Sequence, residues 1–329
     1  MKAMVLRVLG QPLQFEERAT PTPSSREVLL EVDACAICRT DLHVIDGELP
    51  GGVLPIIPGH QVVGRVQALG SSIQHLRVGE RVGVSWLASS CGECDFCTRG
   101  MENLCRTASF HGFTRDGGFA SHMVADADYV FPLPAGGQKE AAERAPLLCG
   151  GLIGFRALRF TGDAHRIGLY GFGNAAHLIA QVAHAQGRRV FAFSRRRGDE
   201  ASLLARRLGV HWVGTSDEVP PEPLDAAIVF APVGELIPRA LAAVGPGGVV
   251  VCAGIHMSDV PSFPYRLLWG ERTLRSVANM TREDGRLFLP LAEECELRAS
   301  VTSFPLESAN EALLALRRGT LSGAAVLLP

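Results

Sequence analysis

The stretch Arg166–Ala176 (RIGLYGFGNAA) decides the fold, because it places a strand, a glycine-rich turn and a helix in direct succession. The turn has the pattern Gly171-x-Gly173-x-x-Ala176. The first glycine permits a tight turn, the second lets the backbone approach a pyrophosphate, and the small alanine lets helix and strand pack closely. Phosphates would then lie at the helix N-terminus, where backbone N–H groups are unpaired. In this context the pattern predicts a dinucleotide-binding loop rather than an ordinary turn.

The sequence on either side of this loop alternates between strand and helix patterns. The preceding segment Ala145–Phe160 has the apolar spacing of a helix, although it contains glycines. Strands that alternate with helices predict a parallel, doubly wound sheet, the Rossmann type of α/β fold. The expected elements are the strand Arg166–Tyr170, the helix Ala175–Gln186, the strand Arg189–Phe193, the helix Ala201–Leu208, the strand Ala226–Phe230, the helix Ile237–Val244 and the strand Gly248–Ala253.

The two ends of the chain have a different texture. Short β-type segments separated by proline and glycine predict a β-rich N-terminal part, with Met101–Asp128 rich in loops. The C-terminal tail is expected to return to that part. One domain would comprise residues 1–150 and 285–329, and the Rossmann domain residues 151–284. The expected elements of the first domain are the strands Val28–Val32, Gln61–Leu69 and Arg81–Trp86, the helix Glu307–Arg318 and the strand Ala324–Leu328.

Composition excludes several classes of function. The chain has 329 residues, enough for about two domains. A net charge of −2 gives no electrostatic reason to expect nucleic acid or an anionic membrane as a partner. Met1–Leu9 is short and interrupted by Arg7, so it resembles a strand rather than a signal peptide. No apolar run approaches the ~20 residues of a membrane helix. We therefore expect a cytoplasmic protein.

Four of the nine cysteines form a cluster with the spacing C-x2-C-x2-C-x7-C. Four thiolates at such spacing can close a tetrahedron around Zn²⁺, which describes a structural site. The alternatives are an iron–sulfur cluster or unligated cysteines. Ferredoxin-type clusters typically have a proline after the last cysteine, whereas Arg106 stands here. The predicted structural zinc ligands are Cys91, Cys94, Cys97 and Cys105.

Three further residues, Cys38, His60 and Cys149, could hold a second metal ion. Each also has a simpler interpretation. Cysteine is among the residues most often buried, and a histidine beside Gly59 could be an ordinary loop residue. Cys35 and Cys38 are spaced like a redox pair. Spacing alone therefore leaves a catalytic metal site as one alternative among several.

The order of the motifs closely resembles that in the zinc-dependent medium-chain alcohol dehydrogenases. The resemblance is greatest to their bacterial and fungal tetrameric branch. CAICRTDLH at Cys35–His43 is followed by GHQVVG at Gly59–Gly64, the four-cysteine cluster, LLCGG at Leu147–Gly151 and the glycine fingerprint. The resemblance covers nearly the whole chain, including the tail Leu321–Leu328. It implies a GroES-like catalytic domain beside the Rossmann domain, and interconversion of alcohols with aldehydes or ketones by hydride transfer.

The resemblance also implies a role for each residue of the first motifs. Cys38, His60 and Cys149 would hold catalytic zinc and leave one position open for water or substrate oxygen. Zinc there would stabilise an alkoxide, which expels hydride more readily than a neutral alcohol does. Thr40 would take the proton of the alcohol and His43 would pass it to solvent. Arg39 would meet the cofactor pyrophosphate, and Asp41 would orient the imidazole of His60. Gln61 departs from the family, which usually has glutamate there, and this puts the rate of ligand exchange at the metal in doubt.

The end of the second Rossmann strand predicts which dinucleotide binds. An NAD site needs Asp or Glu there for the ribose 2′-hydroxyl, but the strand ends in Ser194-Arg195-Arg196-Arg197. A hydroxyl followed by guanidinium groups suits a 2′-phosphate and favours NADP(H). Asp199 and Glu200 lie slightly later and would serve NAD if that strand ended later.

Trp86 is expected to line a substrate pocket between the domains, with Thr40 and Phe110 nearby, or else to belong to the core. An indole there suggests modest primary alcohols or flat aromatic aldehydes. The alternatives are a polyol or formaldehyde dehydrogenase of the same superfamily, a zinc-free quinone reductase, and a non-catalytic zinc-stabilised sensor. The family suggests a homodimer or homotetramer. Cys35, Cys252 and Cys295 receive no role.

Overall fold

The computed structural model describes residues 1–321 and 323–329, so Ser322, within the tail Leu321–Leu328, lies outside the described residues. The chain divides into two compact units, which are described separately. The first unit comprises Met1–Cys149, Asn279–Leu289 and Arg298–Pro329, and the second comprises Gly150–Ala278 and Pro290–Leu297.

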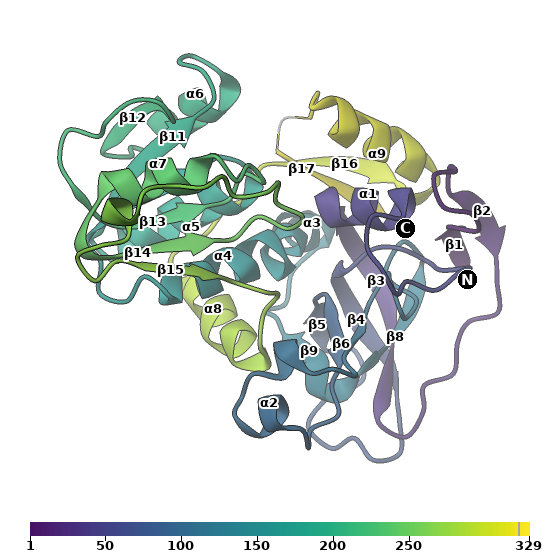
Figure 1. Ribbon diagram of the computed structural model, residues 1–329. Coiled ribbons are helices and arrows are strands. Elements are labelled where there is room, and N and C mark those ends of the chain that lie inside the picture. Colours follow the sequence, from purple (N-terminus) through teal and green to yellow (C-terminus); the bar gives the residue numbers. More distant parts are fainter. Residues whose placement is uncertain (322) are drawn as a thin grey trace. The chain divides into compact units, whose positions relative to one another are not determined.

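The second unit is built on a parallel sheet in the order β12-β11-β10-β13-β14-β15 (Figure 1). All neighbouring pairs in this sheet run parallel. The order starts at β10 and extends first to one side, then to the other, so the predicted doubly wound α/β sheet is confirmed. Its strands are β10 (Arg166–Tyr170), β11 (Arg189–Ser194), β12 (Trp212–Thr215), β13 (Leu224–Val229), β14 (Val244–Cys252) and β15 (Thr273–Ser276).

Helices connect these strands across both faces of the sheet. The chain moves from β10 to β11 in one direction and from β13 to β14 in the other, so right-handed crossovers place α5 and α7 on opposite faces. The strand order therefore reverses at Gly171, directly after β10, and ligands of such sheets bind at this point. The helices of this unit are α4 (Gly150–Arg159), α5 (Asn174–Ala185), α6 (Glu200–Arg207) and α7 (Leu236–Ala243).

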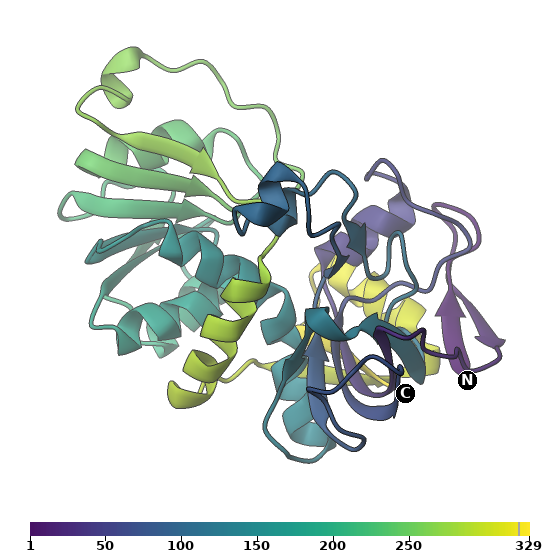
Figure 2. The ribbon, with the colours of Figure 1, turned by 90° about the horizontal axis from the view of Figure 1, so that it is seen from below.

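Aromatic residues fill one side of this sheet. The rings of Tyr170 and Phe193 stack at 4.0 Å between centroids, and Trp212 lies at 5.1 Å from Phe193. Tyr170 and Phe193 are buried, and each contributes roughly 1.5–3 kcal/mol through removal from water. Between β14 and β15 the chain makes the long excursion 253–272, visible in Figure 2 as the light green loop. Tyr265 and Trp269 in this excursion are each 67% exposed.

The first unit contains a mixed sheet in the order β16-β17-β3-β4-β5-β9, with β8 also paired to β3. The C-terminal strand β17 pairs antiparallel with β3, which makes the tail part of this sheet. The strands of the sheet are β3 (Glu27–Ile37), β4 (Gln61–Leu69), β5 (Arg81–Val84), β8 (His122–Asp126), β9 (Val130–Pro132), β16 (Val301–Pro305) and β17 (Ala324–Leu328). Two smaller pairs are β1 (Lys2–Val5) with β2 (Gln14–Glu17) and β6 (Leu87–Ser89) with β7 (Ser109–Phe110).

Some sequence-based expectations about this unit were wrong. The strand expected at Val28–Val32 extends to Ile37, because β17 and β4 continue to pair with it beyond Val32. The stretch Met101–Asp128 is rich in loops, as expected, but it also contains the strand β8, which pairs with β3. Local composition could not show this pairing, because its partner strand lies far away in the sequence.

One helical segment that begins in the first unit is broken where the sequence predicted a continuous helix. The helix expected over Ala145–Phe160 is interrupted: a 3-10 turn covers Ala145–Leu148, Cys149 leaves the helical conformation, and α4 follows. α8 begins in the first unit and its last residues belong to the second. The α-helices are α1 (Arg39–Asp46), α2 (Asp95–Thr98), α3 (Gln138–Arg144), α8 (Arg282–Glu294) and α9 (Ala309–Arg318).

Candidate active site

Cys38 lies where β3 ends and α1 begins. It is the N-cap of α1, with extended φ and ψ of −136° and −177°, and its Sγ accepts a hydrogen bond from the backbone N–H of Thr40 at 3.3 Å. Asp41 completes a capping box, because its Oδ2 accepts from the backbone N–H of Cys38 at 2.8 Å. The sulfur is therefore fixed by the start of the helix and lies among donors that favour a thiolate.

His60 lies directly before β4 and is fully buried. Its Nδ1 is 3.2 Å from Oδ1 of Asp41, and its Nε2 is 3.3 Å from Sγ of Cys38. The carboxylate accepts from Nδ1, which leaves Nε2, the ring atom beside the sulfur, as the atom that would bind a metal. Burial lowers the pKa of His60, but the charges of Asp41 and Cys38 outweigh it and raise that pKa to about 10.

Cys149 supplies the third donor, from the break between the 3-10 turn and α4. The sulfurs of Cys38 and Cys149 and a ring nitrogen of His60 all lie within 4.8 Å of one another. The hydrogen bond from Cys149 holds the pKa of Cys38 well below its usual value, and the same bond raises the pKa of Cys149. The two cysteines therefore share a proton that a cation would displace.

This donor set fits zinc. Two thiolates and one imidazole nitrogen are the ligands that catalytic zinc uses, with a fourth position left open. For tetrahedral zinc, bond lengths of about 2.3 and 2.0 Å imply a sulfur–nitrogen separation of roughly 3.5 Å, and the observed value is 3.3 Å. The sequence-predicted trio is thus brought together from segments far apart in the chain.

The remaining residues of the first motif lie on α1. Thr40 is buried in the first turn, and His43 is half-buried one turn later on the same side of the helix. Nδ1 of His43 is hydrogen-bonded to Oε2 of Glu48, which the sequence analysis did not single out. Arg39 is exposed at the first position of the helix.

Trp86 packs directly against the imidazole of His60. Their rings meet edge to face at 4.9 Å, and the other neighbours of the indole are Phe110 at 5.4 Å and Phe113 at 5.7 Å. The indole is only half-buried, although it packs against the core of the first unit. Trp86 therefore packs against the core and contacts His60, and its role in lining a substrate pocket stays a prediction.

Two buried polar side chains near this site have unsatisfied atoms. Nε2 of Gln61 donates to the carbonyl oxygen of Ala36 at 3.3 Å, a bond that a carboxylate could not make, while its Oε1 has no partner in the described part of the chain. His111 bonds the carbonyl of Ser85 through Nδ1 at 2.9 Å, and its Nε2 has no described partner. Burial lowers the pKa of His111 to about 4, so its ring is neutral. The sequence analysis missed this histidine.

The four-cysteine cluster forms a second donor set on a local loop around α2. The sulfurs of Cys91, Cys94, Cys97 and Cys105 lie within 4.8 Å of one another. Three of their separations are 3.6, 3.6 and 3.8 Å. A zinc–sulfur bond of about 2.3 Å implies a tetrahedron edge of about 3.8 Å. Backbone N–H groups of Cys91 and Cys94 also point at sulfurs of the cluster. The cluster fits a closed, structural zinc site.

The dinucleotide loop has the geometry that its glycines predict. Gly171 has a φ of +87°, and a Cβ there would lie 2.8 Å from the Cβ of Ala231. Gly173 is the N-cap of α5, and a Cβ on it would meet no protein atom within 4 Å, so its surroundings are open to a ligand. Ala176 is fully buried against the sheet. The loop can therefore receive a pyrophosphate at the first turn of α5.

Ser194 is the last residue of β11 and is buried. Its Oγ lies 3.0 Å from the carbonyl oxygen of Arg196 and 3.3 Å from that of Gly214, so its proton is engaged and its lone pairs can accept. Arg195 and Arg196 are exposed and make no side-chain ion pair among the described residues. Asp199 is engaged as the N-cap of α6, where its carboxylate accepts from Ser202 and Arg196.

The comparisons with known proteins agree with this architecture. A family model described as the alcohol dehydrogenase GroES-like domain matches residues 24–135. The chain is 43% identical over 325 residues to "Probable alcohol dehydrogenase AdhA" of Mycobacterium tuberculosis, covering 96% of this chain and 93% of that one. It is 35% identical to an alcohol dehydrogenase of Geobacillus stearothermophilus, covering 99% of each. The cobalt- and zinc-bound thermostable alcohol dehydrogenase of Pyrobaculum aerophilum is 25% identical, with a TM-score of 0.89 over 100% of this chain and 99% of that one.

The fold and the two donor sets define a two-domain α/β oxidoreductase with a metal-binding catalytic domain and a dinucleotide-binding domain. The chain belongs to the zinc-dependent medium-chain alcohol dehydrogenase family. It interconverts alcohols with aldehydes or ketones by hydride transfer to or from a nicotinamide dinucleotide. None of the described helices is long and apolar enough to cross a membrane.

Proposed function

We propose that Cys38, His60 and Cys149 form the catalytic zinc site of this enzyme, and that the four-cysteine cluster binds a second, structural zinc. The observation that supports this most is the convergence of three donor atoms within 4.8 Å, with Asp41 fixing the tautomer of His60. When bound, zinc acts as a Lewis acid that lowers the pKa of a substrate hydroxyl. The remaining chemistry falls to residues of α1.

Thr40 and His43 are proposed to move the proton of the alcohol. Thr40 is two residues from the sulfur of Cys38, and its hydroxyl can both accept a proton and pass one on. His43 lies one turn further along α1 and is half-buried, which suits a group that exchanges protons with solvent. Asp41 has a positioning role, because it contacts His60 and the backbone of Cys38. Arg39, exposed on the same helix, is proposed to meet the cofactor pyrophosphate.

The preferred cofactor is proposed to be NADP(H). Ser194 offers lone pairs at the end of β11, and Arg195 beside it is a guanidinium without an ion-pair partner among the described residues. The nearest acid, Asp199, is occupied in capping α6, so it is poorly placed to accept from a ribose hydroxyl. A 2′-phosphate would supply the negative charge that this strand end lacks. Gly171, Gly173 and Ala176 are proposed to hold the pyrophosphate.

The substrate is proposed to be a small primary alcohol or a flat aromatic aldehyde. The indole of Trp86 lies edge-on to His60 and stacks with two phenylalanines, so a flat apolar surface adjoins the metal ligands. A polyol dehydrogenase would need polar groups there instead. A non-catalytic sensor would have no use for a trio with an open position. We also propose that the enzyme is cytoplasmic and forms a homodimer or homotetramer. The exposed rings of Tyr265 and Trp269, which precede the edge strand β15 in the chain, favour contact with a second copy.

Two measurements test this proposal. Metal analysis should find two zinc ions per chain, one for each donor set. The variant Cys149→Ala should keep one zinc and lose activity by about a thousandfold or more, because a missing ligand empties the catalytic site. Rates with a panel of primary alcohols and aldehydes should be higher with NADP(H). A preference for NAD(H) of more than about tenfold would contradict the cofactor assignment, and activity retained by Cys149→Ala would contradict the metal assignment.

A further inference from the structure

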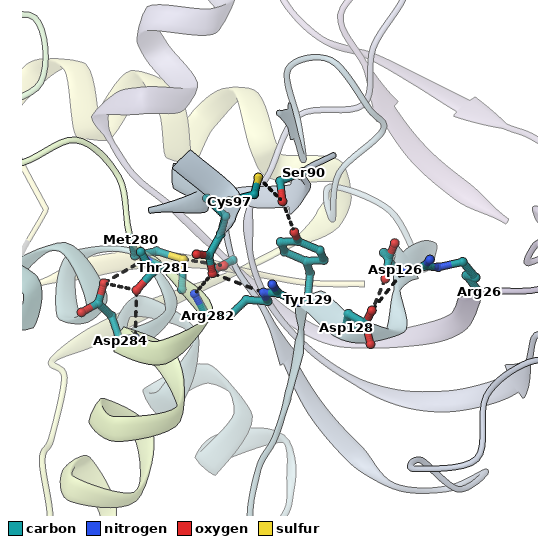
Figure 3. Close-up of polar contacts among 12 residues, drawn as sticks. Arg26, Ser90, Cys97, Asp126, Asp128, Tyr129, Met280, Thr281, Arg282 and Asp284 are labelled. Atoms are coloured by element: carbon teal, nitrogen blue, oxygen red, sulfur yellow. Dashed lines mark hydrogen bonds and ion pairs between the residues drawn. The ribbon is translucent and has the colours of Figure 1, made fainter. Parts of the chain in front are cut away.

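A pair of hydroxyl groups connects the body of the first unit to the four-cysteine cluster. Oγ of Ser90 lies 3.4 Å from Sγ of Cys97 and 2.6 Å from the phenolic oxygen of Tyr129, as Figure 3 shows. Ser90 directly follows β6, and Tyr129 ends the 3-10 turn between β8 and β9. Both hydroxyls therefore come from outside the cysteine loop, and the one of Ser90 contacts a sulfur of it while the one of Tyr129 contacts Ser90.

Tyr129 is held in place by a second connection to the same loop. Its ring lies under the guanidinium of Arg282, with the carbon of that group 4.9 Å from the ring centroid. Arg282 donates from its backbone N–H at 2.9 Å and from Nε at 3.2 Å to Oε1 of Glu102. Glu102 is buried and lies between Cys97 and Cys105 in the sequence. The contacts thus run from the loop through Arg282 and Tyr129 to Ser90, and back to the loop at Cys97.

The chemistry of the sulfur determines the direction of these hydrogen bonds. A cysteine that binds zinc is a thiolate, which accepts hydrogen bonds and cannot donate them. Ser90 must then donate its proton to Cys97, and its oxygen is free to accept the proton of Tyr129. Each hydroxyl has one proton, so this is the arrangement in which both bonds form at once. A hydroxyl that itself accepts a hydrogen bond is polarised and becomes a stronger donor.

We propose that Tyr129 and Ser90 form a hydroxyl chain that donates to the Cys97 thiolate and slows the release of zinc from the four-cysteine site. The hydroxyl of Thr107 lies 3.5 Å from the sulfur of Cys105, and no described residue places a second hydroxyl on it. Ser90 and Tyr129 are positioning residues, because they act on the metal through a ligand. Outer partners of metal ligands typically change metal affinity by about 10- to 100-fold.

The test measures zinc transfer from the full-length, zinc-loaded protein to an excess of a chromogenic chelator. The Cys149→Ala variant identifies the phase that belongs to the four-cysteine site, because it lacks a ligand of the other site. Ser90→Ala should accelerate that phase about tenfold or more, and Tyr129→Phe should accelerate it less, because the serine donor remains. Ser109→Ala is the matched control: Ser109 shares a hydroxyl pair with Ser89 at 2.5 Å, and none of the described hydrogen bonds joins either hydroxyl to a cysteine.

Two further measurements separate hydrogen bonding from packing. Ser90→Thr keeps the hydroxyl and should restore slow release even though it changes the volume. In cobalt-substituted protein, loss of the donor should shift the sulfur-to-cobalt charge-transfer band to lower energy in Ser90→Ala but not in Ser109→Ala. The proposal is overturned if Ser90→Ala releases zinc at the rate of the control, or if Ser90→Thr releases it as fast as Ser90→Ala.

Discussion

The two donor sets of this protein are built in opposite ways. Cys38, His60 and Cys149 come from three distant segments and converge at the end of β3 and the start of β4. The four cysteines of the second set come from one loop around α2, where Cys91 is exposed and backbone N–H groups point at the sulfurs. The first set depends on the tertiary fold to exist. We expect the second to depend on a bound metal for its order, because a short loop has little apolar surface to bury.

The largest expected effect comes from removing a ligand of the local set. Cys105→Ala should forfeit on the order of 10 kcal/mol of metal binding, which is the term that orders the loop. Amide hydrogen exchange should rise over 91–105 and in the first turn of α8, because Glu102 holds the backbone N–H of Arg282. The other zinc should remain, since none of its proposed ligands lies in the cysteine loop. Loss of both zinc ions would refute the independence of the two sets, and Cys295→Ala is the matched control.

A second prediction concerns the stability of the folded protein at low pH, and it depends on His111, which is buried near the three-ligand set. Burial holds the pKa of His111 at about 4 in the folded protein, against 6.5 for a free histidine. Below pH 6.5 the unfolded chain gains a proton there that the folded chain does not, so stability falls as pH drops from about 6.5 to about 4 and this contribution then levels off. The full loss would be about 3 kcal/mol.

The measurement is the chemical unfolding midpoint at several pH values in this window. His111→Asn keeps a donor for the carbonyl of Ser85 but cannot take up a proton, so its stability should fall less steeply with acid than that of the unmodified protein. His75→Asn is the control, because the ring of His75 also bonds a carbonyl, that of Ala127, but is exposed. Equal slopes for His111→Asn and the unmodified protein would show that His111 does not determine acid stability.

The same contrast explains how much the sequence could predict. Alternating patterns predicted β10, β11, β13 and β14 to within a few residues, because each has an apolar run between turn signals, whereas β12 and β15 were not predicted. The four-cysteine cluster could also be predicted from the sequence, since its members lie within fifteen residues of one another. Cys38, His60 and Cys149 required the resemblance to a family, because nothing in their spacing shows that they meet.

Other features could not be predicted because they depend on long-range contacts. β8 was not predicted within the loop-rich stretch Met101–Asp128, although it pairs with β3. α8 was not predicted, and its first turn is tied to Glu102 in the cysteine loop. No pattern in the sequence marks Ser90 or Tyr129. Only the fold brings the hydroxyl of Ser90 next to Cys97 and that of Tyr129 next to Ser90. Gln61 was noted as a departure, and the structure adds that its amide donates to Ala36.

The smallest expected effect concerns Asp41, which contacts two members of the three-ligand set. It tests how strongly zinc affinity at that set depends on this carboxylate. Asp41 uses both carboxylate oxygens, one for the backbone N–H of Cys38 and one for Nδ1 of His60. An asparagine has one oxygen and must present its NH₂ to one of these donors. If the NH₂ faces His60, the ring must carry its proton on Nε2, the atom that would bind zinc.

Asp41→Asn should therefore lower zinc affinity at the three-ligand set about 10- to 100-fold, or roughly 1.4–2.7 kcal/mol, and leave the four-cysteine set unchanged. Competition titration with a chelator measures both affinities. Asp46→Asn is the matched control on the same helix, because Asp46 pairs with Arg317 and does not contact a ligand. If Asp41→Asn binds zinc as tightly as Asp46→Asn does, the fold itself orients His60, and the carboxylate serves only to cap α1.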